Sequence, residues 1–388
     1  MTSSSEPVAT AMSAASIEGS DRLHARARAM VAAFVADQPP PEPFDALACD
    51  LARHQAAEIE GYARLCRARG VDPAALVSAA DIPAVPTDAF KLTRVATFPP
   101  ASTTKIFRTS GTTAGARGEN AVRDVATYDA AAIAFGRRWL MRDLERRVPV
   151  VVLGPSPEQA ADSSLVHMCE AFVRTFGAPA SPASTYLVDQ DGIIDVGAFD
   201  ERVAFALTNN EPMLILGTSF AFVHFIDAVG KDTFVLPAGS RVMQTGGYKG
   251  RSREVPAAVL RSDLSRVFGI DVRSIVGEYG MTELASQFYE RTLFDTAAPL
   301  GVYAEPPWAR VVPVDPDTLV PVRDGDVGIA KVIDLMNVDS AVVVLTQDQV
   351  RRAGEGFELL GRAPGAPPRG CSIAIDEILG RHGRTVEE

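Results

Sequence analysis

Apolar side chains recur at roughly helical intervals through residues 44–70, for example at Leu47, Leu51 and Leu65, and the segment ends at a glycine. This spacing predicts a helix with one buried face. The Pro-rich stretch that follows, residues 82–100, disfavours the α region before each proline. We therefore expect the chain to run extended from this helix to the next element.

Further along, helix-like stretches alternate with short apolar runs. Apolar runs of this length between helices are typical of buried strands in a mainly parallel sheet. The expected strands lie within residues 148–154, 212–218, 240–247 and 272–280, and the expected helices within residues 127–142, 163–176, 219–229 and 255–268. The pattern predicts an α/β fold, with mainly parallel sheets flanked by helices.

The two ends of the chain differ from this central pattern. Residues 1–20 are mostly small and polar, and offer too little apolar surface to offset the entropy of ordering, so we expect a disordered tail. After about residue 298, strand-like segments such as VGIAKVIDL and SAVVVLTQD replace the helices. We predict an α/β core at residues 21–298 and a β-rich closing subdomain with a short C-terminal segment at residues 299–388.

Composition narrows the class of protein. The chain has 388 residues, of which 47% are hydrophobic and 22% charged, as expected of a globular protein with a sizeable core. Its net charge of −11 argues against binding nucleic acid through bulk charge. No apolar run approaches the roughly 18 residues of a membrane span, and no signal peptide is evident. The four cysteines form no CxxC pair, so we expect reduced thiols and a cytoplasmic protein.

Glycine and hydroxyl side chains are concentrated at residues 109–119, which read TSGTTAGARGE. Backbone N–H groups and hydroxyls in such a loop can wrap a polyphosphate, and Arg117 adds a fixed positive charge. A Gly/Thr-rich surface turn explains the same composition equally well. The loop is not a Walker A motif, because the GK[ST] ending is absent.

A second motif, GEYGMTE at residues 277–283, follows directly after the apolar run VRSIV. Residues at the carboxyl end of a parallel strand face the crevice where α/β proteins bind ligands. An aromatic ring, a hydroxyl and a carboxylate at that position predict a nucleotide and metal site. The alternative is an ordinary strand-to-helix turn in which Glu283 is stabilised by the helix dipole.

Together, TSGTTxGxRGE and YGMTE resemble the signature pair of the adenylate-forming (acyl-AMP-forming) superfamily. More narrowly, the chain is similar to the LuxE-type acyl-protein synthetases, the fatty-acid-activating component of bacterial luminescence fatty-acid reductase. Supporting segments lie at residues 82–91, 162–168, 245–254 and 356–374, and the resemblance covers about residues 44–379. It implies the N-terminal-domain fold of adenylate-forming enzymes, with ATP and Mg²⁺ as cofactors.

The resemblance also implies roles for individual residues. Arg117 would lie near the leaving pyrophosphate, Thr282 would reach the α-phosphate, and Glu283 would hold Mg²⁺. The loop over the β- and γ-phosphates would be formed by Thr109, Ser110, Gly111, Thr112, Thr113 and Gly115.

Other positions would bind the nucleoside. Gly246 and Gly247 would let the backbone approach adenine, and Tyr279 would lie against its ring. Asp348 would bind the ribose hydroxyls, with Arg362 nearby.

The implied reaction is attack of a substrate carboxylate on the α-phosphorus of ATP, which gives an acyl adenylate and pyrophosphate. Such a transfer depends on alignment and charge neutralisation more than on a protein nucleophile.

The sequence departs from the family pattern at two places. Arg117 stands where lysine is usual, and only 388 − 362 = 26 residues follow Arg362, too few for the large mobile C-terminal domain of typical relatives. The second departure favours the shorter LuxE type over an acyl-CoA ligase.

Cys371, in PPRGCSIAIDE, is the residue that the resemblance suggests as the acyl acceptor. A lone cysteine in an apolar stretch is equally well explained as a small buried side chain. The other three cysteines lie on expected helices, and we interpret them as structural.

Three hypotheses for function remain open. The leading one is activation of a carboxylic acid, such as a fatty acid, with acyl transfer to Cys371 or to a partner protein such as a reductase subunit. In the second, the acyl group passes directly to coenzyme A, a carrier protein or an amine. In the third, the chain is a non-catalytic nucleotide-binding or scaffold subunit. The sequence does not identify the acid or the oligomeric state.

Overall fold

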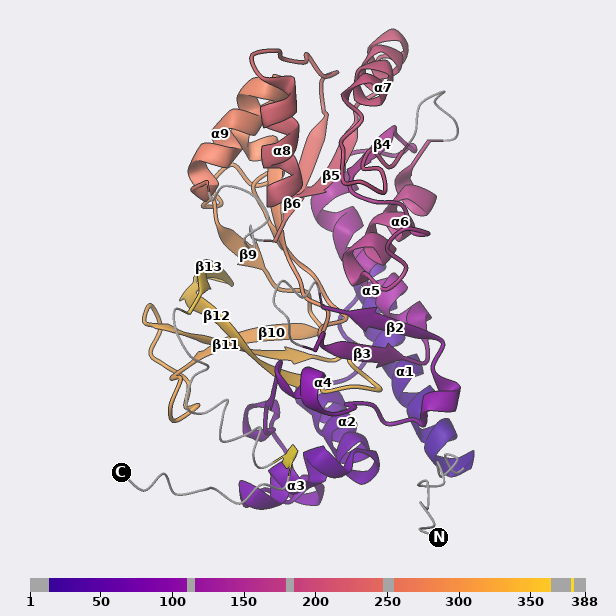
Figure 1. Cartoon of the computed structure of the whole chain (residues 1–388). Coiled ribbons are helices and arrows are strands. Elements are labelled where there is room, and N and C mark those ends of the chain that lie inside the picture. Colours follow the sequence, from indigo (N-terminus) through magenta and orange to yellow (C-terminus); the bar gives the residue numbers. More distant parts are fainter. Residues whose placement is uncertain (1–13, 110–115, 179–184, 247–254, 364–377, 380–388) are drawn as a thin grey trace, which may run out of the picture.

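A computed structural model describes residues 14–109, 116–178, 185–246, 255–363 and 378–379 of the chain (Figure 1). Its helices are α1 (Ala14–Val35), α2 (Phe44–Glu58), α3 (Glu60–Ala68), α4 (Ala89–Leu92), α5 (Val125–Gly136), α6 (Ser164–Phe176), α7 (Val196–Asn209), α8 (Ser219–Val229) and α9 (Ala257–Phe268). Its strands are β1 (Val85–Pro86), β2 (Lys105–Arg108), β3 (Glu119–Val122), β4 (Val150–Leu153), β5 (Leu214–Thr218), β6 (Arg241–Thr245), β7 (Ile275–Tyr279), β8 (Phe288–Glu290), β9 (Val302–Ala304), β10 (Ala309–Val314), β11 (Val327–Asp334), β12 (Val343–Ala353) and β13 (Gly356–Arg362).

One large mixed sheet runs through the molecule in the order β10-β11-β12-β13-β9-β8-β7-β6-β5-β4, and β1 pairs with β12. The strands β4 to β7 are parallel to one another, as the sequence predicts. In the rest of the sheet, which runs from β7 through β8, β9, β13, β12 and β11 to β10, each neighbouring pair of strands is antiparallel. The α/β fold is thus confirmed. The β-rich part of the chain continues the same sheet through β8 and β9. The predicted division into two parts at residue 298 therefore stays a prediction.

The parallel strands are buried on both faces because helices cover both. Alternate residues of β4 point to opposite sides: Val150 and Val152 pack in the core that includes α5 and α6, whereas Val151 and Leu153 pack against α7, α8 and α9. In Figure 1 the latter three helices gather at the upper end of the molecule, and α1, α2 and α3 lie at the lower end. This double coverage explains why these strands read as unbroken apolar runs.

Side-chain caps set where the central helices begin. Asp124 accepts from Ala126 N at the start of α5, Ser163 accepts from Val166 N at α6, and Thr218 accepts from Ala221 N at α8. Each of these oxygens satisfies a backbone N–H group that has no partner within the helix. The starts of these helices are therefore encoded locally.

Three features differ from the sequence prediction. The predicted tail reaches residue 20, but α1 begins at Ala14, and Ser20 is buried with its hydroxyl 2.6 Å from Asp339 Oδ1. Long-range contacts of this kind order a segment whose composition alone favours disorder. The helix expected over residues 44–70 is divided at Ile59, where the backbone is extended. The helix α7 has no counterpart among the predicted elements.

Candidate active site

The carboxyl ends of β6 and β7 lie side by side, with Thr245 in register with Glu278. Gly246 follows β6 directly and Tyr279 is the last residue of β7. The φ of Gly246 is +70°, a left-handed conformation that a glycine adopts without a steric penalty. The structure thus brings together two of the residues predicted to contact adenine, at the sheet edge where ligands of α/β proteins bind.

Tyr279 also connects this edge to the antiparallel part of the sheet. Its hydroxyl donates a hydrogen bond to Asp348 Oδ2, 2.9 Å away, and its ring packs against Phe288 and Phe357. Burial and the Asp348 charge raise the pKa of Tyr279 well above its ordinary value, so the phenol stays a neutral donor. Arg362 lies opposite Asp348 in the β12–β13 register. Its side chain donates through Nη2 to Gln347 Oε1 at 2.8 Å, so of these predicted nucleoside-binding side chains Tyr279 and Asp348 are in direct contact and Arg362 lies on the neighbouring strand.

The turn that carries Thr282 and Glu283 is fixed by two buried asparagines. Asn120 Nδ2 donates to the Thr282 carbonyl at 2.8 Å, and Asn337 Nδ2 donates to the Glu283 carbonyl at 2.9 Å. Glu283 itself is only 5% exposed. The turn is thus held by segments far apart in sequence, and neither asparagine carries a motif that would have identified it.

The backbone immediately after this turn is held by a buried carboxylate. Asp334 Oδ2 accepts from Ala285 N at 2.9 Å and from Ser286 N at 2.8 Å, while its Oδ1 accepts from the Ser286 hydroxyl at 2.6 Å. Charged acceptors make hydrogen bonds about twice as strong as neutral ones. Asp334 therefore fixes the chain leaving Glu283, and sequence analysis did not single it out.

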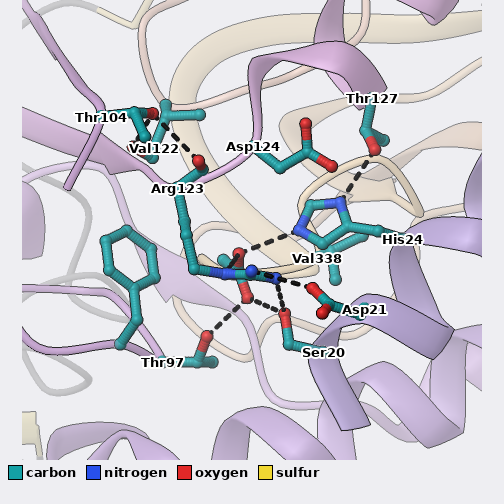
Figure 2. A network of polar contacts seen from close by, with 12 residues as sticks. Ser20, Asp21, His24, Thr97, Thr104, Val122, Arg123, Asp124, Thr127 and Val338 are labelled. Carbon is teal, nitrogen blue, oxygen red and sulfur yellow. Dashed lines mark hydrogen bonds and ion pairs between the residues drawn. The ribbon is translucent and has the colours of Figure 1, made fainter. Parts of the chain in front are cut away.

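Asp339 follows Asn337 by two residues in the chain and is the centre of a polar network. Figure 2 shows this network. The Asp339 carboxylate accepts hydrogen bonds from Ser20, Thr97 and Arg123 and contacts His24 Nε2 at 2.9 Å. Burial alone raises the pKa of this carboxyl, but the contacts with His24 and Ser20 and the Arg123 charge hold the pKa well below its usual range. The network joins α1 to the loop that precedes β12.

Arg117 closes the base of the predicted phosphate loop. It donates through Nε to the Thr109 carbonyl at 2.6 Å and through Nη1 to Asp162 Oδ2 at 2.8 Å. The Thr109 hydroxyl in turn accepts from Gly118 N at 2.8 Å. The guanidinium is therefore held by the start of the loop and by the DSSLVHM segment, a geometry that is consistent with a fixed charge beside the loop.

Glu278 is a further polar residue of this region, for which the GEYGMTE motif predicts no role. It is 5% exposed, accepts a hydrogen bond from the Thr245 hydroxyl, and has its pKa raised by burial to about 7. A carboxyl group with a pKa this high is common where proteins place acids for chemistry. An acidic residue inside an otherwise apolar strand was the signal that could have identified it.

Seven predicted site residues lie outside the described residues, and their predicted roles stay predictions: Thr113, Cys371, Ser110, Gly111, Thr112, Gly115 and Gly247. Within the described ranges, no three His, Cys, Asp or Glu side chains lie close enough together to form a metal site. A Mg²⁺ ion at Glu283 would take its remaining oxygen ligands from phosphates and water, which is the usual donor set of this ion.

Comparison with known proteins decides the family. The family model described as "Acyl-protein synthetase, LuxE" matches residues 36–380, nearly the whole chain. The chain belongs to the LuxE acyl-protein synthetases. Membership in this family confirms the predicted resemblance and the predicted enzyme class, an adenylate-forming acyl ligase, and disfavours the scaffold hypothesis.

One relative of this LuxE synthetase is the long-chain-fatty-acid–luciferin-component ligase of Aliivibrio fischeri. It is 22% identical over 320 residues, which are 77% of this chain and 79% of that protein. The family and this relative support ATP-dependent formation of an acyl adenylate followed by acyl transfer, the reaction that the sequence predicts.

A solved structure confirms the fold. A 2-hydroxyisobutyryl-CoA ligase in complex with 2-HIB-AMP and CoA has a TM-score of 0.55 and 15% identity, covering 92% of this chain and 72% of that one. MatB from Rhodopseudomonas palustris has a TM-score of 0.47 and 14% identity, covering 66% of this chain. This chain spans only 47% of the length of MatB. In the described part of the LuxE synthetase, every helix is too short or too polar to cross a membrane.

Proposed function

We propose that this LuxE synthetase uses ATP and Mg²⁺ to activate a carboxylic acid, of the fatty-acid class, as its acyl adenylate. A carboxylate oxygen attacks the α-phosphorus, the bond between that phosphorus and the bridging oxygen breaks, and pyrophosphate leaves. The observation that carries the proposal is the convergence of Tyr279, Asp348 and the Thr282–Glu283 turn at the carboxyl end of β7. These groups match the nucleoside, phosphate and metal contacts that the reaction needs.

Each group has a distinct task in this proposal. Tyr279 would lie against the adenine ring, and Asp348, which already accepts from the Tyr279 hydroxyl, would accept hydrogen bonds from the ribose hydroxyls. Glu283 would hold Mg²⁺, which when bound neutralises phosphate charge; a carboxylate is an oxygen donor of the kind this ion takes, and Asn337 fixes the backbone from which it projects. Arg117 supplies a charge that favours the leaving pyrophosphate. Catalysis is thus attributed to alignment and charge rather than to a protein nucleophile.

The second step is transfer of the acyl group to Cys371. The thiolate attacks the acyl carbonyl carbon, the bond to AMP breaks, and a thioester forms while AMP leaves; the thiol proton goes to solvent. The described residue nearest to it on the N-terminal side, Ala363, donates its N–H to the Gln347 carbonyl, adjacent to Asp348. Seven residues separate Ala363 from Cys371, and the eight Cα–Cα steps span at most about 28 Å, so the proposal requires the thiol to act within this distance of Ala363.

The acceptor after Cys371 would be a partner protein, such as a reductase subunit or carrier protein. Cytoplasmic location belongs to the same proposal. It is supported by Cys49, Cys66 and Cys169, which are buried free thiols, as expected in a reducing compartment.

An ATP–pyrophosphate exchange screen over aliphatic, aromatic and amino acids tests the activation step. We expect pyrophosphate exchange that depends on one class of acid. Failure of every acid in the screen to support exchange would contradict the proposal. Glu355→Gln is a matched control for Glu283→Gln, because the Glu355 side chain is 90% exposed.

Mass spectrometry with hydroxylamine treatment tests the transfer step. We expect an acyl adduct on Cys371 that hydroxylamine removes. Active exchange without an adduct would favour direct transfer of the acyl group to an external acceptor.

A further inference from the structure

A cavity of about 160 Å³ lies between the end of α3, residues 81–84 and the strands β11 and β12. Its walls are mostly apolar, with Leu65, Ile82 and Leu345 almost completely buried and Leu319 closing one side. A cavity of about this size is large enough for a benzene ring. The space therefore suits the apolar body of a small organic molecule.

One cation projects into this apolar space. Lys331 Nζ donates to the Ala80 carbonyl at 2.8 Å, and an ammonium group has three N–H donors. Within the described ranges, no carboxylate lies within ion-pair distance of it. Burial lowers the pKa of Lys331 to about 8, and the nearby charge of Asp81 acts in the opposite direction. At pH 7 the Lys331 amine is therefore mostly protonated.

The other charged groups at the cavity are Arg69 and Asp81, both exposed at its edge. The combination of apolar walls and a half-buried cation is complementary to an anion with an apolar body. A carboxylate on a short carbon skeleton has that chemistry.

Leu319 shows that the wall of the cavity is fixed by local structure. Its φ is +60°, a conformation that few residues other than glycine adopt. The Asp315 carbonyl accepts from Leu319 N at 2.9 Å, and Asp315 Oδ1 accepts from Thr318 N at 2.8 Å. These hydrogen bonds keep Leu319 in its left-handed conformation, with its side chain at the cavity.

The cavity is separate from the nucleotide-binding edge. Lys331 is in register with Leu345 across β11 and β12, so both side chains lie on one face of the sheet. Tyr279, Thr282, Glu283 and Asp348 are not among the residues that line the cavity. The strand β12 therefore contributes Leu345 to the cavity, whereas Asp348, further along the same strand, belongs to the nucleotide-binding edge.

We infer that this cavity is a second ligand site, which binds a small monocarboxylic acid with its carboxylate on Lys331 and its carbon body against Leu65, Leu319 and Leu345. The inference does not depend on the proposed function, because none of these residues belongs to the nucleotide-binding edge.

The test uses 4-fluorobenzoate as the probe and follows its ¹⁹F linewidth on titration with the full chain in the absence of ATP. We expect binding with a Kd of about 1 mM or tighter. Lys331→Met keeps the side-chain stem but removes the charge, and should weaken binding about tenfold or more. Lys231→Met, at an exposed position far along the chain, is the matched control and should bind as the wild type does.

Two further measurements keep the inference independent of a single variant. The uncharged analogue 4-fluorobenzamide should bind much more weakly than the acid to the wild type, and equally weakly to Lys331→Met. Ala84→Leu, which fills the cavity from its apolar side, should also lose binding. Equal affinity of wild type and Lys331→Met for the acid, or of acid and amide for the wild type, would overturn the inference.

Discussion

Replacing Glu278 by glutamine should change how the free energy of unfolding depends on pH. In the folded protein this carboxyl is buried and its pKa is raised from 4.5 to about 7. Between these two values the folded state keeps a proton that the unfolded chain releases. Stability from this group is therefore fully present below about pH 4.5 and is lost as the pH rises to about 7.

The magnitude follows from the size of this change in pKa. At about 1.4 kcal/mol per pH unit, the contribution lost over this range is about 3 kcal/mol. Glutamine has the same shape, accepts the same hydrogen bond from Thr245 and does not titrate. The wild type should therefore lose about 3 kcal/mol relative to Glu278→Gln over this range.

Urea unfolding of both proteins at several pH values from about 4.5 to about 8 measures this difference. Because other groups titrate equally in both proteins, the difference between the two curves isolates Glu278. Glu355→Gln, at an exposed carboxylate, should give a flat difference against the wild type. A flat difference for Glu278→Gln as well would refute the claim that this carboxyl is held protonated by burial.

The remaining predictions concern the reaction and the support of the site. Glu283→Gln should reduce ATP–pyrophosphate exchange about a hundredfold or more while the thermal midpoint stays close to that of the wild type; exchange at wild-type rate at low Mg²⁺ would contradict the metal-ligand role. Cys371→Ser should keep exchange but lose the thioester, measured by intact-protein mass spectrometry, and an adduct that persists on another cysteine would refute the assignment. Asp339→Ala should lower the free energy of unfolding by about 3 kcal/mol in urea, because it leaves the buried His24 and the half-buried Arg123 without their shared partner; a loss below about 1 kcal/mol would show that the network is not structurally important.

The sequence predicts the parallel half of the fold because local patterns encode it. Runs such as residues 148–154 and 212–218 are apolar throughout, and the strands β4 and β5 form within them. The helix α8 begins and ends where its apolar spacing indicates, at Ser219 and Val229. The position of Tyr279 at the end of β7 follows from the same reasoning.

The support of the site was not predictable because it depends on long-range contacts. Asn120 lies 162 residues before Thr282, whose carbonyl it binds, and Ser20 lies 319 residues before Asp339. A polar residue of this kind leaves no periodic pattern in the sequence. The helix α1 was missed for the same reason, since its buried polar residues find their partners only in the folded chain.

Transfer of oxygen from the acid to AMP tests the central claim most directly. If a substrate carboxylate attacks the α-phosphorus of ATP, an acid labelled with ¹⁸O in its carboxylate leaves one ¹⁸O atom in AMP once the acyl group has been transferred. Mass spectrometry of the nucleotide products from the wild type, with an acid active in the exchange screen, should therefore show AMP heavier by one ¹⁸O, together with pyrophosphate. Unlabelled AMP, or ADP and phosphate as the products, would contradict an acyl-adenylate mechanism.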